Sequence, residues 1–284
     1  MSIDRTYSPE DLQKTQEVLL EILKDVLRVC AENNITIFAE GGTAIGAVRH
    51  GGFIPWDDDI DLWVLREDYE KLKTVLAQQL SPAFGIDHWL SNKDFPSPNL
   101  CVYAKGTISV PIEMKDCKYR YGISLGIYPY DNIPDDEKKA NAQMRRGWFW
   151  GKMHWLKMLP FPYLPYKGVK RTLIHAFCGV THIFLKLVPN KFIVNQCEKA
   201  CRMYNGLSTK KMTIVMAGNP HRTVIEKDKI FPPVVFDFDG LSIILPACYH
   251  ELLTREYGDY MQIPPKDKQK NHFPCELKFK EDKD

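Results

Sequence analysis

The stretch "EGGTAIGAVRHGGFIPWDDDIDLWV" (residues 40–64) joins a glycine-rich turn to four aspartates within five positions. The preceding run "ITIFAE" (35–40) is β-branched and aromatic and predicts a strand, and "DIDLWVL" (59–65) predicts a second one. Between them the sequence predicts a turn at Gly41-Gly42-Thr43 and a short helix over "AIGAVRH" (44–50). This order of elements indicates an α/β fold.

The aspartates are spaced so that they share one face of the second strand. Side chains alternate along a strand, so Asp57, Asp59 and Asp61 are expected together while Ile60 and Leu62 face the core. Asp59 and Asp61 are then about 7 Å apart along the backbone. Carboxylates this close repel unless a cation lies among them, and Mg²⁺ suits such oxygen ligands. A solvated acidic turn is the alternative.

The glycine turn adds a second feature. Backbone N–H groups of Gly41 and Gly42, at the start of a helix, are free to hold a phosphate. A Gly-Gly-Thr before an Asp-x-Asp on consecutive strands resembles the arrangement of the nucleotidyltransferase superfamily, with somewhat longer spacing here.

The full string 40–64 closely resembles the signature of the LicD family of phosphocholine and related phosphoglycosyl-polymer transferases. The fukutin-type ribitol-phosphate transferases are distant relatives of that family. "FPPVVFDFDGLSIILP" (231–246) followed by "YGDYMQIPP" (257–265) is similar to the family's C-terminal block. The middle of the chain matches poorly.

The resemblance implies a transferase that moves phosphocholine, or a related phospho-alcohol, from a CDP-linked donor and releases CMP. The acceptor would be a sugar hydroxyl of a cell-surface glycan precursor, as in lipopolysaccharide or teichoic acid, free or lipid-linked. One or two Mg²⁺ ions, or Mn²⁺, would serve as cofactor. Two alternatives stay open: a nucleotidyltransferase that releases pyrophosphate, and a non-catalytic glycan-binding relative.

By motif position the resemblance makes Asp59 and Asp61 the catalytic metal ligands. A quaternary ammonium group is commonly held on aromatic faces, and Trp56, Trp63, Tyr128 and Tyr130 are near the site in sequence. Ordinary core packing is the alternative for each of these rings. The expected substrate-binding residues are Gly41, Gly42, Thr43, Arg49, His50, Trp56 and Asp57.

A third carboxylate is harder to place. The family often carries an acidic residue just before a hydrophobic-aromatic-Pro step, and here that position is Gly126 in "GIYPYD". The third catalytic or metal-binding carboxylate is therefore expected at Asp131, with Glu113 in "PIEM" as the alternative.

We expect an α/β fold with a nucleotidyltransferase-like mixed sheet flanked by helices and a mainly helical accessory region. The expected domains are a catalytic core (1–134), a basic, aromatic-rich helical region (135–210) and a C-terminal cap (211–284). Eight cysteines without paired spacing predict free thiols and a cytoplasmic protein. The N-terminus has no apolar signal core.

The middle of the chain is strongly basic. Eleven Lys and Arg residues and no Asp or Glu lie between Glu137 and Glu198. Packing with a basic outer face is the first interpretation. Contact with an anionic lipid-linked acceptor or the membrane surface is the second, and no nucleic acid is expected. The apolar run 172–188 is short for a membrane span.

Overall fold

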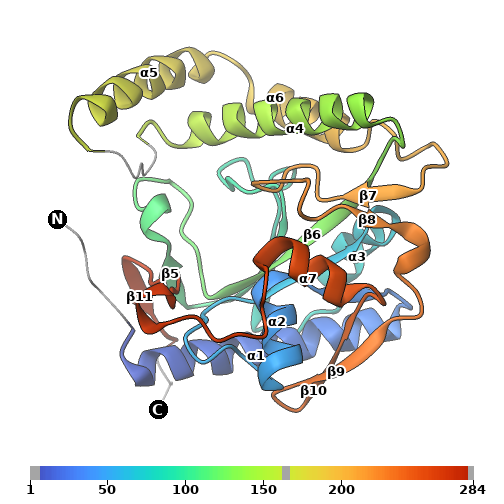
Figure 1. Ribbon diagram of the computed structural model, residues 1–284. Coiled ribbons are helices and arrows are strands. Elements are labelled where there is room, and N and C mark those ends of the chain that lie inside the picture. Colours follow the sequence, from blue (N-terminus) through green and yellow to red (C-terminus); the bar gives the residue numbers. More distant parts are fainter. Residues whose placement is uncertain (1–6, 162–166, 281–284) are drawn as a thin grey trace.

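The computed structural model describes residues 7–161 and 167–280. A mixed nine-stranded sheet runs through the molecule in the order β3-β4-β6-β2-β1-β10-β9, with β7 attached to β6 and β8 to β7 (Figure 1). The helices are α1 (Pro9–Glu32), α2 (Gly41–His50), α3 (Arg66–Gln79), α4 (Glu137–Met158), α5 (Gly168–Lys186), α6 (Asn190–Cys201) and α7 (Tyr249–Tyr257). The strands are β1 (Ile37–Ala39), β2 (Asp61–Leu65), β3 (Phe84–Asp87), β4 (Leu100–Ala104), β5 (Ile108–Val110), β6 (Ser124–Ile133), β7 (Lys211–Thr213), β8 (Ile225–Glu226), β9 (Val234–Phe238), β10 (Leu241–Leu245) and β11 (Glu276–Lys278). The predicted mixed sheet with flanking helices is confirmed.

Helix α1 forms where local signals predict it. The Ser8 hydroxyl caps it by accepting a hydrogen bond of 3.0 Å from the Asp11 N–H, and Pro9 occupies the first turn. One face of the helix is buried in the main core. Helix α1 therefore packs against the sheet that carries the aspartates.

The unit β1-α2-β2 lies at the centre of the sheet. Strand β1 pairs antiparallel with β2, and β2 pairs parallel with β6 so that Asp61 stands opposite Gly126. Helix α2 begins at Gly41, three residues before the prediction, and β2 begins at Asp61, two residues after it. Asp59 therefore lies in the segment that leads into the strand rather than in the sheet ladder.

The β-rich sequence between residues 84 and 131 predicts several strands, of which the one over "TISVPIEM" (107–114) is only partly formed. Strand β5 ends at Val110, and Pro111 leads into a single 3₁₀ turn over Ile112–Met114. Proline lacks the N–H that a strand ladder needs, which accounts for the early end. The remaining strands predicted between 84 and 131 are present as β3, β4 and β6.

The C-terminal part of the chain contributes strands to the sheet. Strands β9 and β10 form a hairpin, as the turn-forming pair Asp239-Gly240 predicts, and these two residues have φ of 50° and 81°. Strand β10 pairs parallel with β1, and β7 pairs with β6. Segments more than 200 residues apart in sequence thus meet at the centre of the molecule.

The predicted accessory region is helical. Helices α4, α5 and α6 form a layer beside the sheet, with α5 outermost (Figure 1). The layer has its own core, in which His154 of α4 lies edge-on against Trp89 at 5.2 Å between ring centroids. All eight cysteines lie in the described part of the chain and are free, as predicted.

Candidate active site

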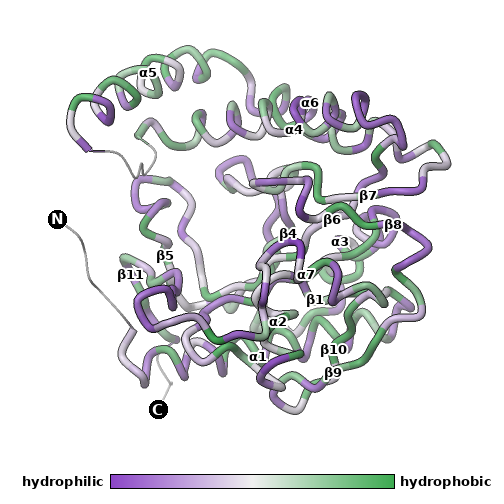
Figure 2. Tube along the Cα trace, viewed as in Figure 1, coloured by the Kyte–Doolittle hydropathy of each residue, from purple (hydrophilic) through white to green (hydrophobic). Residues whose placement is uncertain are grey.

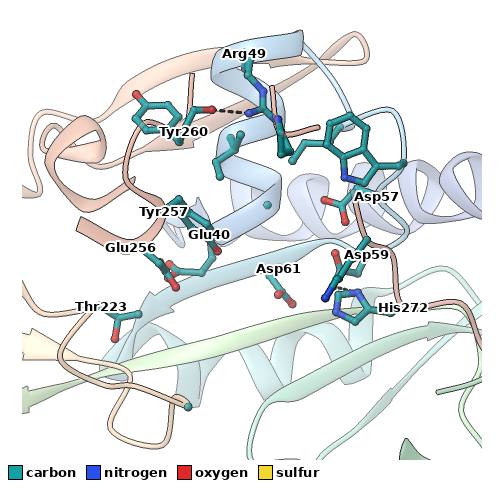
Figure 3. A pocket seen from close by; sticks show the side chains of 18 of the residues that line it. Glu40, Arg49, Asp57, Asp59, Asp61, Thr223, Glu256, Tyr257, Tyr260 and His272 are labelled. Carbon is teal, nitrogen blue, oxygen red and sulfur yellow. Dashed lines mark hydrogen bonds and ion pairs between the residues drawn. The ribbon is translucent and has the colours of Figure 1, made fainter. Parts of the chain in front are cut away.

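A cavity of about 860 Å³ opens beside the start of β2. Its walls come from the N-terminus of α2, the segment before β2, Tyr128 of β6, the end of α7 and the stretch from Asp259 to His272. Figure 3 shows these side chains converging on one space from parts of the chain that are distant in sequence.

Three aspartates point into this cavity. Asp57, Asp59 and Asp61 all line it, as their alternation predicts. Ile60 is fully buried in the core, and the Asp58 side chain is turned away to accept a hydrogen bond from the His272 N–H at 2.8 Å. The burial of Ile60 therefore fixes the direction of the acidic residues on either side of it.

The charge of the aspartates is poorly compensated by the protein. Burial, followed by the charge of Asp59, raises the pKa of both Asp57 and Asp61 to about 8. Burial also raises the pKa of Asp59. The nearby Tyr128 side chain opposes the rise in the pKa of Asp61 only in part. The site is thus suited to an added cation.

His272 is the cationic side chain placed nearest to these carboxylates. Its Nδ1 lies 3.4 Å from Asp59 Oδ2 and 3.5 Å from Asp58 Oδ1. The hydrogen bond to Asp58, followed by the charges of the neighbouring aspartates, raises the pKa of His272 to about 9. Sequence reasoning did not select this residue, because a single histidine 211 residues after Asp61 has no local pattern that reveals the contact.

The turn after β1 holds Asp61 from its backbone. The Asp61 N–H donates to Thr43 Oγ1 at 2.9 Å, and the Asp61 carbonyl accepts from the Glu40 N–H at 2.9 Å. Thr43 is buried and does not line the cavity. The structure therefore corrects the expectation that Thr43 binds substrate phosphate, because its hydroxyl is used to position Asp61.

Both predicted glycines line the cavity, and both leave room for its contents. Gly41 has φ of 51°, and a Cβ there would lie 2.9 Å from the Tyr257 hydroxyl. A Cβ on Gly42 would lie 2.7 Å from Asp57 Oδ2. The first turn of α2 is thus bare backbone facing the aspartates, and its N–H groups carry the positive end of the helix dipole.

Two further carboxylates border the cavity that sequence reasoning did not select. Burial, followed by the charges of Glu256 and Asp61, raises the pKa of Glu40. Burial also raises the pKa of Glu256, at the end of α7. Glu40 is the first residue of the motif 40–64, so its place beside the site could have been predicted from the sequence. Glu256 reaches the cavity only through the packing of α7 beside α2.

Arg49 and His50 occupy different environments at the end of α2. Arg49 lines the cavity, where its guanidinium donates to the backbone carbonyls of Tyr260 and Gln262 and to His50 Nε2. Burial lowers the pKa of His50, which does not line the cavity. The structure thus places Arg49 in the site and His50 outside it.

The aromatic residues proposed for a quaternary cation divide into two pairs. Trp56 and Tyr128 line the cavity. Trp63 and Tyr130 are buried in the core, where Trp63 stacks on Phe38 at 4.1 Å between centroids. Two tyrosines that the sequence did not single out, at 257 and 260, also line the cavity.

Asp131 is not close to the aspartate pair. It lies five residues beyond Gly126, the strand partner of Asp61, which is roughly 17 Å along β6. Its two carboxylate oxygens accept hydrogen bonds of 2.7 Å from Arg66, and Asn205 donates a third. The expectation of a third metal-binding carboxylate at Asp131 is corrected: this side chain is half of a buried ion pair.

Glu113 does not replace it. This residue is exposed on the 3₁₀ turn after Pro111 and does not line the cavity. At the position where the family often has an acid, a Cβ on Gly126 would lie 2.9 Å from both Asp61 Oδ1 and Asn99 Nδ2. An amide therefore occupies the place beside Asp61 where a third carboxylate was sought.

A second cavity, of about 430 Å³, borders the same aspartates. Asp59, Asp61, Tyr128 and His272 line both cavities. Trp155 of α4 lines only the second one. The acidic pair thus stands between two spaces, which suits a reaction between two substrates.

The residues present fit a divalent cation that also binds substrate. Within residues 7–161 and 167–280, no three His, Cys, Asp or Glu side chains form a complete metal site. Mg²⁺ is commonly bound by one or two carboxylates plus substrate phosphates. Asp59 and Asp61 provide those carboxylates beside the bare N-terminus of α2, where a phosphate would complete the ligand set.

The mixed sheet with flanking helices and the acidic cavity are those of a nucleotidyltransferase-like domain. Residues 34–172 match the model of the LicD/FKTN/FKRP nucleotidyltransferase domain. Residues 34–172 therefore form a domain of the LicD family, and the protein is a transferase. The extents expected for the separate domains stay a prediction.

Relatives agree with this assignment. The chain is 28% identical over 268 residues to the lipopolysaccharide cholinephosphotransferase LicD of Haemophilus influenzae, covering 92% of this chain and 95% of that protein. A 50-residue stretch is 42% identical to the human ribitol 5-phosphate transferase FKRP, covering 18% of this chain and 10% of FKRP. A solved terminal uridylyl transferase 4 from Trypanosoma brucei with bound GTP aligns over 80% of this chain and 75% of that chain, with 10% identity and a TM-score of 0.23, too low to support an argument.

Proposed function

We propose that this protein transfers phosphocholine from CDP-choline to a sugar hydroxyl of a lipopolysaccharide-type glycan and releases CMP. The observation that carries the proposal is the acidic pair Asp59 and Asp61, placed between two cavities and beside the bare N-terminus of α2. The relative that aligns along nearly the whole chain is a cholinephosphotransferase acting on lipopolysaccharide.

The donor would occupy the larger cavity. The first N–H groups of α2, at Gly41 and Gly42, would hold the pyrophosphate, and Arg49 would add positive charge at the rim. The choline head group is a quaternary cation, for which Trp56 and Tyr257 offer aromatic faces. Glu256, next to Tyr257, adds negative charge to that end of the cavity.

Mg²⁺ would be held by Asp59 and Asp61 and would supply charge neutralisation for the pyrophosphate when bound. Phosphoryl transfer depends mainly on such neutralisation and on in-line positioning. The acceptor would enter by the second cavity, so that its hydroxyl meets the donor phosphorus at the aspartates. A bond would form between the acceptor hydroxyl oxygen and the phosphorus of the phosphocholine group. The bond from that phosphorus to the bridging oxygen would break, this oxygen would leave with CMP, and the hydroxyl proton would pass to solvent or a carboxylate.

Thr43 and Tyr128 position Asp61 in this proposal. Thr43 fixes the Asp61 backbone, and Tyr128 would support its carboxylate from the wall of both cavities. The eight free thiols favour a reducing, cytoplasmic location for the reaction.

The test is product analysis with matched donors. The purified protein is incubated with CDP-choline, CDP-ribitol or CDP-glycerol and a lipopolysaccharide acceptor, with Mg²⁺ or with EDTA. We expect Mg²⁺-dependent CMP release, fastest with CDP-choline, and its loss in Asp61→Asn but not in Asp116→Asn, an exposed aspartate outside both cavities. In a parallel incubation with CTP, pyrophosphate release would instead indicate nucleotidyl transfer, and turnover of no donor would indicate a binding protein.

A further inference from the structure

Helix α5 exposes a continuous apolar stripe. Six large apolar residues recur at intervals of three or four, which places them on one helical face. Each is at least 55% exposed; they are Val169, Leu173, Phe177, Val180, Phe184 and Leu187. Figure 2 shows the apolar colouring of this helix at the outer edge of the molecule.

The opposite face of α5 is anchored, so the stripe has a defined direction. Cys178, His182 and Leu185 are buried in the helical layer. His182 Nδ1 is hydrogen-bonded to the Leu156 carbonyl at 2.8 Å, and Lys157 Nζ donates to the Leu185 carbonyl at 2.7 Å. The exposed stripe is therefore a stable outward face of α5.

Two further rings are exposed on the same helical layer. Phe161 is 56% exposed and lies against α5, with its ring 5.8 Å from that of His175. Phe192, at the start of α6, is 48% exposed, and its ring lies 5.9 Å from that of Trp150 of α4. We call the six residues of the stripe the α5 surface.

The charge around the α5 surface selects its partner. Arg171, Lys186 and Lys191 are exposed at the two ends of the helix. They belong to a segment with eleven Lys and Arg and no Asp or Glu between Glu137 and Glu198. A second copy of the chain would bring the same positive charge against itself, whereas an anionic lipid surface would complement it.

We propose that the α5 surface binds in the plane of an anionic lipid bilayer. An apolar face with flanking basic residues is the pattern of an interfacial helix. Among the described helices, none is long and apolar enough to cross a membrane; α5 and α6 pass on length and composition only as a pair bent by 105°. The surface is separate from the proposed chemistry.

Such binding would hold the active site at a fixed distance from the lipid. Helix α4 lies between α5 and the larger cavity. It packs closely on Val215 and Met216, because Gly147 and Gly151 have no side chains at these contacts. Met216 lines that cavity. A lipid-linked acceptor would then be presented from the side on which Trp155 borders the second cavity.

The test is sedimentation with vesicles of phosphatidylcholine alone or mixed with phosphatidylglycerol. We expect binding to the mixed vesicles only, weakened when salt rises from about 0.1 M to about 1 M. The variant Phe177→Ser/Phe184→Ser should lose at least about tenfold in partition coefficient. The matched control is Leu207→Ser/Val235→Ser, which changes residues of similar exposure (59% and 63%) outside the α5 surface and should bind like the wild type.

Two further measurements keep the result decisive. If the phenylalanine variant fails to fold by circular dichroism, Arg171→Gln/Lys186→Gln provides the comparison, and it should also weaken binding to the mixed vesicles. Light scattering reports the oligomeric state in parallel. Equal binding by wild type and both surface variants, binding to neither vesicle, or a dimer that Phe177→Ser/Phe184→Ser dissociates would overturn the proposal.

Discussion

Asp61 and Gly126 stand opposite each other on the parallel strands β2 and β6, and a Cβ on Gly126 would lie 2.9 Å from Asp61 Oδ1. The space beside the aspartate is thus closed to a side chain from the neighbouring strand. The Asn99 amide already occupies part of it, with Nδ2 at 2.9 Å from the same point. Strand β6 therefore places no third carboxylate beside the acidic pair.

Gly126→Ala should reduce turnover at least about tenfold, because the new methyl group must displace the Asp61 carboxylate or Asn99. Overpacking of this kind typically costs about 1–3 kcal/mol of unfolding free energy. CMP release and urea unfolding measure the two effects. Gly206→Ala is the control, since no atom lies within 4 Å of its Cβ position. Unchanged turnover in Gly126→Ala would show that the carboxylate's position is not critical.

Asp61→Asn and Asp131→Asn should have opposite effects. Asp131 pairs with Arg66, whose side chain is 9% exposed. Neutralising Asp131 leaves the buried guanidinium only its longer contacts with Glu70 at 3.4 Å and Glu198 at 3.6 Å, at a cost of about 3 kcal/mol. Asp61→Asn removes a carboxyl whose pKa is already raised by burial, so the variant should fold normally and lose turnover. Urea unfolding and CMP release distinguish them. Loss of activity without loss of stability in Asp131→Asn would show that Asp131 belongs to the active site.

Trp56→Leu should raise the KM for CDP-choline by about threefold to thirtyfold, in line with about 0.5–2 kcal/mol for a cation–π contact. The KM for CDP-ribitol should hardly change, because that donor has no quaternary ammonium group. Steady-state kinetics with both donors provide the measurement and its internal control. An equal rise in both KM values would mean that Trp56 supports the cavity without recognising choline.

The helical layer should loosen in acid. Burial lowers the pKa of His154 to about 4, and its Nε2 is buried without a hydrogen-bond partner. In the unfolded chain the pKa of a histidine is about 6.5, so the unfolded chain takes up this proton first as the pH falls. Stability is fully present above pH 6.5 and is lost as the pH falls toward 4, by up to about 3 kcal/mol.

The measurement for His154 is urea unfolding at pH 7 and pH 4.5 in the wild type and in His154→Gln, which cannot titrate. The variant should lose less unfolding free energy than the wild type over this interval. A parallel decline in the two proteins would place the acid sensitivity elsewhere.

Local patterns in the sequence predict the frame of the site. Alternation predicts the common direction of Asp57, Asp59 and Asp61, and the glycine pair predicts the bare start of α2. Both features depend on residues within 25 positions of one another. For the same reason, the Ser8 cap and the Asp239-Gly240 turn are correctly predicted.

The rest of the site depends on tertiary packing that no local pattern encodes. His272 reaches Asp59 from the far end of the chain, and Tyr257 meets Gly41 because α7 packs beside α2. Asp131 is acidic and close in sequence to the motif strand, yet the register of β6 carries it to Arg66. An acidic residue can therefore lie on the strand next to Asp61 and still be too far along that strand to reach the site.

The most direct test of the account is a crystal structure of the protein with Mn²⁺ and CDP, using anomalous scattering to locate the ion. We predict an anomalous peak within about 2.0–2.5 Å of carboxylate oxygens of both Asp59 and Asp61, with the CDP phosphates at the N-terminus of α2. A peak held by other residues, or CDP bound with no ion between it and this pair, would contradict the account.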